Sequence, residues 1–148
     1  MATVGKQKQI APAVEGWFTM DGEPRLLGTR CSSCGTYFFP KETFFCRNPA
    51  CNGREFEEVK LSRRGKVWSF TNAAYKPPPP YVAAEPYEPF AIAAVELEEE
   101  KMVILGQVVA EADFDSLGVG MEMELVLGTL FEDDEAIYQT WRWKPVTD

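Results

Sequence analysis

Apolar and polar residues alternate along the second half of the chain in patterns that predict β-strands. Met121, Met123, Leu125 and Leu127 share one parity and alternate with Glu122 and Glu124, which is the two-residue period of a strand with one buried face. The isoleucine and both tryptophans of residues 137–143 share one parity and predict a last strand. Two apolar runs, 90–97 and 102–109, flank a short charged segment and predict an antiparallel hairpin.

A further β-rich run covers residues 67–75 and leads into a proline-rich segment, 76–89. Its four successive prolines exclude a central strand and favour an extended polyproline II conformation. About five strands with one long loop and no strong helix are typical of a small closed barrel. We therefore predict a mainly β chain whose last part, residues 59–148, is an OB-fold barrel.

The first part of the chain shows a different pattern. Residues 1–11, which include Lys6 and Lys8, predict a short tail, and the apolar positions between residues 14 and 27 indicate one or two short helical turns. The sequence Asp21-Gly22-Glu23-Pro24 interrupts these turns. We therefore expect an N-terminal tail and a short helical segment over residues 1–28.

All four cysteines lie close together in the sequence, at Cys31, Cys34, Cys46 and Cys51. Two close pairs separated by a loop are typical of a four-thiolate zinc site, because two tight turns can face one tetrahedral ion. Gly35 suits the first turn because glycine tolerates positive φ. Four thiolates leave no open coordination position, so we expect a structural zinc held by these cysteines in a rubredoxin-like zinc ribbon over residues 29–58.

Composition excludes several classes of function. The 148-residue chain contains no histidine, which removes the commonest general base and every histidine-containing triad. It has no apolar run long enough to span a membrane, and its first ten residues lack the apolar stretch of a secretory signal. We expect a cytoplasmic protein without a membrane partner. Acidic pairs such as Asp113 with Asp115, or Asp133 with Asp134, could serve a self-sufficient hydrolase or lyase but are typical of solvated turns.

Charge is distributed unevenly along the chain, which has a formal net charge of −8. Residues 25–66 contain nine basic and four acidic side chains, whereas residues 85–135 contain fifteen acidic side chains and one lysine. A zinc ribbon followed by an OB-fold barrel is also an architecture of modules that bind single-stranded nucleic acid. Such binding needs a positive groove across the barrel, so the acidic barrel makes nucleic-acid binding the weaker hypothesis for this chain.

A compact basic cluster suits a small phosphorylated ligand better. Arginine binds phosphate oxygens bidentately, and Gly65 allows close approach of the backbone. An ordinary solvated turn between two domains is the alternative interpretation. The cluster consists of Lys60, Arg63, Arg64 and Lys66.

Several short motifs occur in the order and spacing of a known family. They are Gly16-Trp17-Phe18, then Arg30-Cys31-Ser32-Ser33-Cys34-Gly35 followed by Phe39-Pro40, then GKVWSFT from Gly65, PFAIAAVEL from Pro89, and Gly118-Val119-Gly120-Met121. By these motifs the chain, from about residue 15 to residue 131, resembles the zinc-ribbon/OB-fold accessory proteins of thiolase-like enzymes, long catalogued as a domain of unknown function. The wide Cys46–Cys51 turn and the proline-rich insertion depart from the family's pattern.

The resemblance implies a non-catalytic subunit that associates with a thiolase-like catalytic chain and helps to form the site for its acyl-CoA thioester. The basic cluster of Lys60, Arg63, Arg64 and Lys66 would then contact the CoA phosphates. Thiolase chemistry needs a nucleophilic cysteine and a general base, and here every cysteine is assigned to the metal. The chemistry must therefore lie on the partner.

The resemblance also indicates two candidate reactions for that partner. One is thiolytic cleavage of an aromatic 3-oxoacyl-CoA of the benzoylsuccinyl-CoA type, as in anaerobic toluene degradation. The other is a steroid side-chain retro-aldol cleavage. The choice between them rests on the resemblance, because no residue of the sequence identifies the acyl group.

Overall fold

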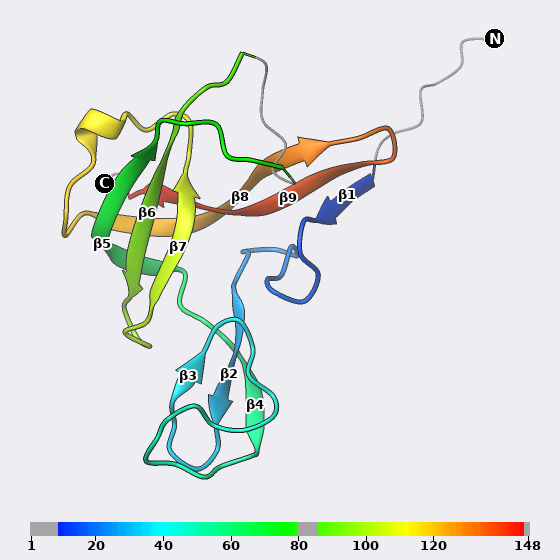
Figure 1. Cartoon of the computed structure of the whole chain (residues 1–148), viewed down its shortest axis with the longest axis vertical. Coiled ribbons are helices and arrows are strands. Elements are labelled where there is room, and N and C mark those ends of the chain that lie inside the picture. The colour runs from blue at the N-terminus through cyan, green and yellow to red at the C-terminus, as the bar shows by residue number, and fades with distance from the viewer. Residues whose placement is uncertain (1–8, 80–85, 147–148) are drawn as a thin grey trace.

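The computed structural model describes residues 9–79 and 86–146, which form a small β-sheet and a barrel placed end to end (Figure 1). The small sheet is antiparallel, in the order β3-β2-β4, and consists of β2 (Leu27–Cys31), β3 (Tyr37–Phe38) and β4 (Phe56–Lys60). The other strands form one sheet: β1 (Gln9–Pro12), β5 (Arg64–Ala73), β6 (Phe90–Leu97), β7 (Val103–Val108), β8 (Glu122–Glu132) and β9 (Ala136–Pro145).

Strands β5 to β9 close into the predicted barrel. They follow one another in the order β5-β6-β7-β9-β8, and β8 returns to pair with β5. The predicted hairpin is confirmed as β6 and β7, which are antiparallel, whereas β7 and β9 run parallel. A β-bulge between Val67 and Ser69 bends β5, as closure of a small barrel requires. The core is apolar and includes the fully buried Trp143, Leu97, Met123, Leu125 and Val95.

The short helical segment predicted near the N-terminus is wrong. Within the described residues the helical structure is limited to the 3-10 turn η1 (Phe114–Ser116). Residues 17–27 instead form an antiparallel pairing, in which Phe18 bridges Leu26 and the Leu27 N–H donates to the Trp17 carbonyl at 2.8 Å. Gly22, with a φ of 60°, makes the turn between these two segments, so their backbone groups pair across the turn rather than within a helix.

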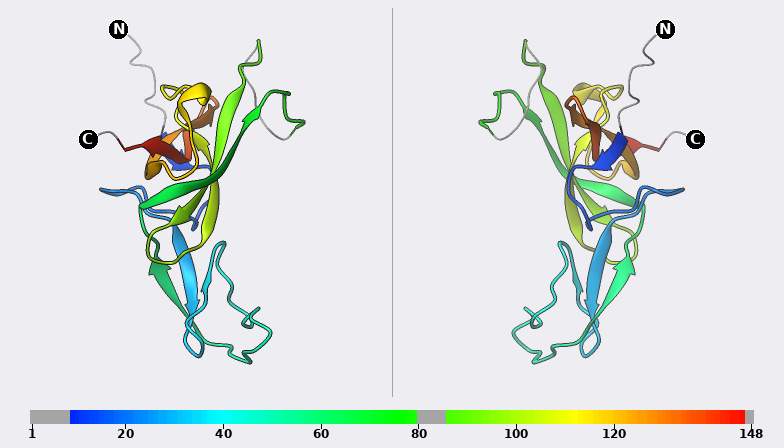
Figure 2. Two further views of the ribbon diagram at one scale, coloured as in Figure 1. Left: turned by 90° about the vertical axis from the view of Figure 1, so that its left-hand side faces the viewer. Right: turned by 90° about the vertical axis from the view of Figure 1, so that its right-hand side faces the viewer.

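An aromatic joint connects the small sheet to the barrel. We use this name for Trp17, Phe18, Phe39 and Trp141. The Trp141 ring stacks on Trp17 with centroids 6.1 Å apart and meets Phe39 edge-on at 5.7 Å. Its indole N–H donates to the carbonyl of Leu105 at 3.0 Å. Three segments far apart in sequence therefore meet at one contact. Figure 2 shows the small sheet and the barrel, placed end to end, from two further sides.

Some expectations fall partly outside the described residues. Of the predicted N-terminal tail, residues 1–8 lie outside them, while residues 9–11 are not a tail, because they belong to β1, which pairs with β9. The centre of the proline-rich segment, residues 80–85, also lies outside the described residues. On the near side of that segment, Tyr75 is 90% exposed. On the far side, the Tyr87 hydroxyl donates to the carbonyl of Ala73 at 2.6 Å. Across the described ranges, no helix reaches the length and apolarity that a membrane-spanning segment needs.

Candidate functional site

The structure brings together all four cysteines that the sequence predicts as metal ligands. Their sulfur atoms lie within 4.8 Å of one another. The sulfur of Cys31 is 3.8 Å from that of Cys51, and the sulfur of Cys34 is 3.6 Å from that of Cys46. Four thiolates at this spacing match the tetrahedral shell of a structural zinc ion, and they leave no position open for a substrate.

Backbone turns hold the two cysteine pairs in place. In the first turn, the Gly35 N–H donates to the Cys31 carbonyl, and Gly35 has the predicted positive φ, 79°. In the second turn, the Cys51 N–H donates to the Asn48 carbonyl, which closes the wider loop. Gly53 has a packing role, because a Cβ at this position would lie 2.9 Å from the sulfur of Cys31. The second turn is therefore wide, but a backbone hydrogen bond closes it and Gly53 packs directly against Cys31.

Groups around the sulfurs shift the acidity of the thiols in opposite directions. A hydrogen bond from the Thr36 hydroxyl, 3.1 Å from the sulfur, lowers the pKa of Cys34 to about 6. Burial raises the pKa of Cys46 to about 12. Binding of a metal ion must therefore displace a proton from Cys46, which makes metal affinity dependent on pH. Thr36 was not among the predicted site residues, although its position two residues after Cys34 was a usable signal.

A buried carboxylate anchors the loop that leads from β3 to the second cysteine pair. Glu42 accepts hydrogen bonds from the Phe44 N–H at 3.1 Å and from Arg47 Nε at 2.7 Å, and these bonds lower its pKa. Its backbone N–H and carbonyl both bond to the Thr29 hydroxyl at 2.9 Å. The loop is thus tied to strand β2 beside the cysteines.

The predicted basic cluster divides into residues with different environments. The Arg63 side chain is only 18% exposed and points into the protein, where Nε donates to the Pro24 carbonyl at 3.0 Å and Nη2 to the Leu125 carbonyl at 2.9 Å. Its third nitrogen lies 3.6 Å from a Glu23 carboxylate oxygen. Arg63 therefore joins the antiparallel segment of residues 17–27 to strand β8.

The other three residues of the cluster lie at the surface. Arg64 is 48% exposed and lies 3.7 Å from a carboxylate oxygen of Glu122 and 3.9 Å from one of Glu124. Lys60 and Lys66 are exposed, and among the described residues the structure gives neither of them an ion pair. Two lysines at the junction of the ribbon and the barrel thus keep their charge available to a ligand.

Comparison with protein families places two adjoining domains on the chain. Residues 20–57 match the family described as the rubredoxin-like zinc ribbon domain of ChsH2, and residues 58–128 match the family described as its C-terminal OB-fold domain. These matches, together with the cysteine cluster, support the expected structural zinc.

Individual relatives give the same assignment. A DUF35 domain-containing scaffold protein of Methanocaldococcus jannaschii is 35% identical, over 90% of each chain. The benzoylsuccinyl-CoA thiolase subunit BbsA of Geobacter metallireducens is 36% identical, over 74% of this chain and 66% of that one. A solved structure titled Ltp2-ChsH2(DUF35) aldolase is 25% identical, with a TM-score of 0.62 over 82% of this chain and 84% of that one. The resemblance found in the sequence is thereby confirmed: the chain belongs to the DUF35 family of zinc-ribbon and OB-fold scaffold proteins.

Proposed function

We propose that this protein is a non-catalytic accessory subunit of a thiolase-superfamily complex that cleaves a 3-oxoacyl-CoA thiolytically. The observation that carries the proposal is the cysteine cluster. Every cysteine of the chain contributes to one closed metal site, and the sequence contains no histidine. The chain thus has no free thiol for the acyl transfer and no imidazole base, and a partner has to supply both.

Two similarities support a partner of the thiolase type. One relative is named as a subunit of benzoylsuccinyl-CoA thiolase, which favours an aromatic 3-oxoacyl-CoA as the substrate. The similar solved structure carries the name of an aldolase complex, which favours retro-aldol cleavage as the second candidate reaction. The two candidates differ in what they release. Thiolysis consumes free CoA and forms two thioesters, whereas retro-aldol cleavage forms one thioester and a carbonyl compound.

Contact with the CoA phosphates is assigned in this proposal to the junction of ribbon and barrel. Lys60 and Lys66 are the exposed residues of the basic cluster that have no ion pair among the described residues, whereas Arg63 and Arg64 contact neighbouring groups of the protein. Lysine binds phosphate as a point charge and suits the flexible end of a CoA molecule. Changing both lysines to glutamate should weaken acyl-CoA binding by the complex. Lys101→Glu, at an exposed position in the turn after β6, is the matched control.

Affinity purification of the tagged chain from its native cells tests the proposal directly. We expect recovery of a thiolase-like chain, with about one zinc ion per copy of this protein. The variant Cys46→Ser should lose both zinc and partner, while Ser32→Ala, at an exposed position between the first two cysteines, should keep both. A chain that purifies alone, or with nucleic acid, would contradict the proposal.

The recovered complex then identifies the reaction. We expect it to convert an aromatic 3-oxoacyl-CoA and free CoA into two thioesters, and neither chain alone should do so at the same rate. If the complex instead cleaves a 3-hydroxyacyl-CoA without consuming free CoA, the retro-aldol candidate is correct. Activity of the isolated accessory chain would refute its non-catalytic role.

A further inference from the structure

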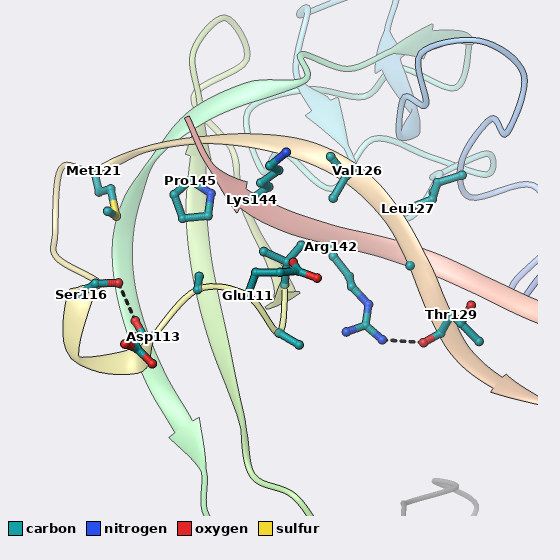
Figure 3. A pocket seen from close by; sticks show the side chains of 14 residues that line it. Glu111, Asp113, Ser116, Met121, Val126, Leu127, Thr129, Arg142, Lys144 and Pro145 are labelled. Atoms are coloured by element: carbon teal, nitrogen blue, oxygen red, sulfur yellow. Dashed lines mark hydrogen bonds between the residues drawn. The ribbon is translucent and has the colours of Figure 1, made fainter. Parts of the chain in front are cut away.

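A cavity of about 940 Å³ opens on the barrel between the loop after β7 and strands β8 and β9 (Figure 3). Most of its lining is apolar and includes Met121, Val126, Leu127 and Pro145. Strand β9 adds two cations, Arg142 and Lys144, and the loop adds two acids, Glu111 and Asp113. None of these residues belongs to the zinc ribbon or to the basic cluster, so the cavity is separate from the sites described above.

Arg142 is the charged group set deepest in this lining. One terminal nitrogen, Nη2, donates to the Thr129 carbonyl at 2.5 Å (Figure 3). Its Nε is buried and has no hydrogen-bond partner, and within the described residues the structure gives the guanidinium no carboxylate partner. A buried polar hydrogen and an uncompensated charge both cost free energy unless a ligand or water satisfies them.

Gly128 fixes the position of this arginine. A Cβ at Gly128 would lie 2.4 Å from Arg142 Nε and 2.5 Å from its Cδ. Gly128 lies inside strand β8, pairs with Thr140 and does not have a left-handed backbone conformation, so it is not needed for a turn. In a strand interior, such a glycine marks a close approach of another group. Here the glycine lets the arginine side chain lie flat against the backbone of β8.

We propose that this cavity binds an organic monocarboxylate with an apolar body. The carboxylate would accept hydrogen bonds from the Arg142 guanidinium, which among the described residues has one hydrogen bond to protein, through Nη2. A planar group of donors matches two carboxylate oxygens. The apolar body would contact Val126 and Leu127, in a cavity of the size that small-molecule sites have.

The remaining charges favour a monoanion over a polyphosphate. Lys144, Glu111 and Asp113 are all exposed, so they belong to the mouth of the cavity rather than to its interior. With Arg142 they sum to no net charge, and the two carboxylates repel a ligand that carries several negative charges. The site belongs to this chain alone and does not depend on the proposed thiolase partner.

Titration of the ¹⁵N-labelled, zinc-loaded full chain with octanoate tests this site. We expect saturable shifts of the Arg142 Nε–H signal and of the backbone amides of residues 126–129. Octanamide has the same apolar body without the charge and should bind at least about 10-fold more weakly, because a hydrogen bond to a charged group is stronger than one to a neutral group. Inorganic phosphate should give no saturable shift of these signals.

Variants distinguish the contribution of Arg142 to octanoate affinity from that of the apolar lining. Arg142→Gln and Gly128→Ala should each weaken octanoate binding at least about 10-fold, and Arg142→Lys should retain part of it. Lys101→Gln, an exposed cation elsewhere on the barrel, should leave the affinity unchanged. Equal affinity for octanoate and octanamide in the unaltered chain would overturn the proposal without any variant. Unchanged affinity in a folded Arg142→Gln protein, or saturable phosphate binding, would overturn it equally.

Discussion

Replacement of Arg63 by methionine should lower the free energy of unfolding by about 3 kcal/mol, whereas Arg64→Met should change it by less than about 1 kcal/mol. The first value follows from two hydrogen bonds donated by a charged side chain, each of which contributes about 1.5–3 kcal/mol. The Pro24 carbonyl belongs to a half-buried residue and can regain a water molecule, but Leu125 is fully buried. We therefore expect a loss of about 3 kcal/mol, the lower end of the sum for the two hydrogen bonds.

The expected change in the free energy of unfolding is small for Arg64→Met because Arg64, unlike Arg63, lies at the surface. Its side chain is half exposed, and both of its carboxylate partners are more than 3.5 Å away. Exposed ion pairs of this kind contribute about 0–1 kcal/mol, and salt screens them further. Methionine keeps most of the apolar stem in both variants, so the comparison isolates the guanidinium groups.

Urea unfolding of the zinc-loaded protein, followed by the fluorescence of its tryptophans, measures both changes. Excess zinc keeps the ribbon folded, so the midpoint reports mainly on the barrel, whose core contains Trp143. Arg63→Lys keeps the charge but cannot reach both carbonyls with one fork, and it should fall between the wild type and Arg63→Met. Equal losses at Arg63 and Arg64, or a loss at Arg63 that disappears at high salt, would refute the assignment of Arg63 as an internal cross-link.

Three further results are expected. Removal of zinc by a chelator should collapse the amide signals of the ribbon while those of the barrel remain, because the small sheet has too little core of its own. Asp133→Asn should lower the pKa of Tyr138, which the carboxylate of Asp133 raises, so a ¹³C titration of the tyrosine ring should show tyrosinate forming at lower pH. Trp17→Ala should lower the free energy of unfolding by about 2 kcal/mol in the same urea assay, since a half-buried tryptophan contributes less than a fully buried one.

The metal site and the barrel were predictable because their signals are local in sequence. Two cysteine pairs at short spacing define a zinc site without any knowledge of the rest of the fold. The hairpin of β6 and β7 likewise has its two strands and its turn in one continuous segment. The spacing of the cysteines and the pattern of apolar residues were therefore sufficient to predict these elements.

Long-range pairing explains what the sequence could not provide. The pattern around Trp17 and Phe18 fits a helical turn as well as an extended segment, and pairing with Leu26 and Leu27 decides between them. Adjacent arginines look alike in sequence, and only the carbonyls of Pro24 and Leu125 distinguish Arg63 from Arg64. The cavity at Arg142 depends on the pairing of β8 with β9, which sets the arginine against a glycine fourteen positions earlier.

The aromatic joint has a consequence for biosynthesis. The ribbon leaves the ribosome early and holds all four cysteines, so it can acquire its metal before the barrel is complete. Trp141, however, belongs to the last strand, and β1 also pairs with that strand. The nascent chain must therefore carry a zinc-loaded ribbon in variable orientations until strand β9 emerges. A truncation before residue 136 should release a chain that binds zinc but cannot hold the ribbon at a fixed angle.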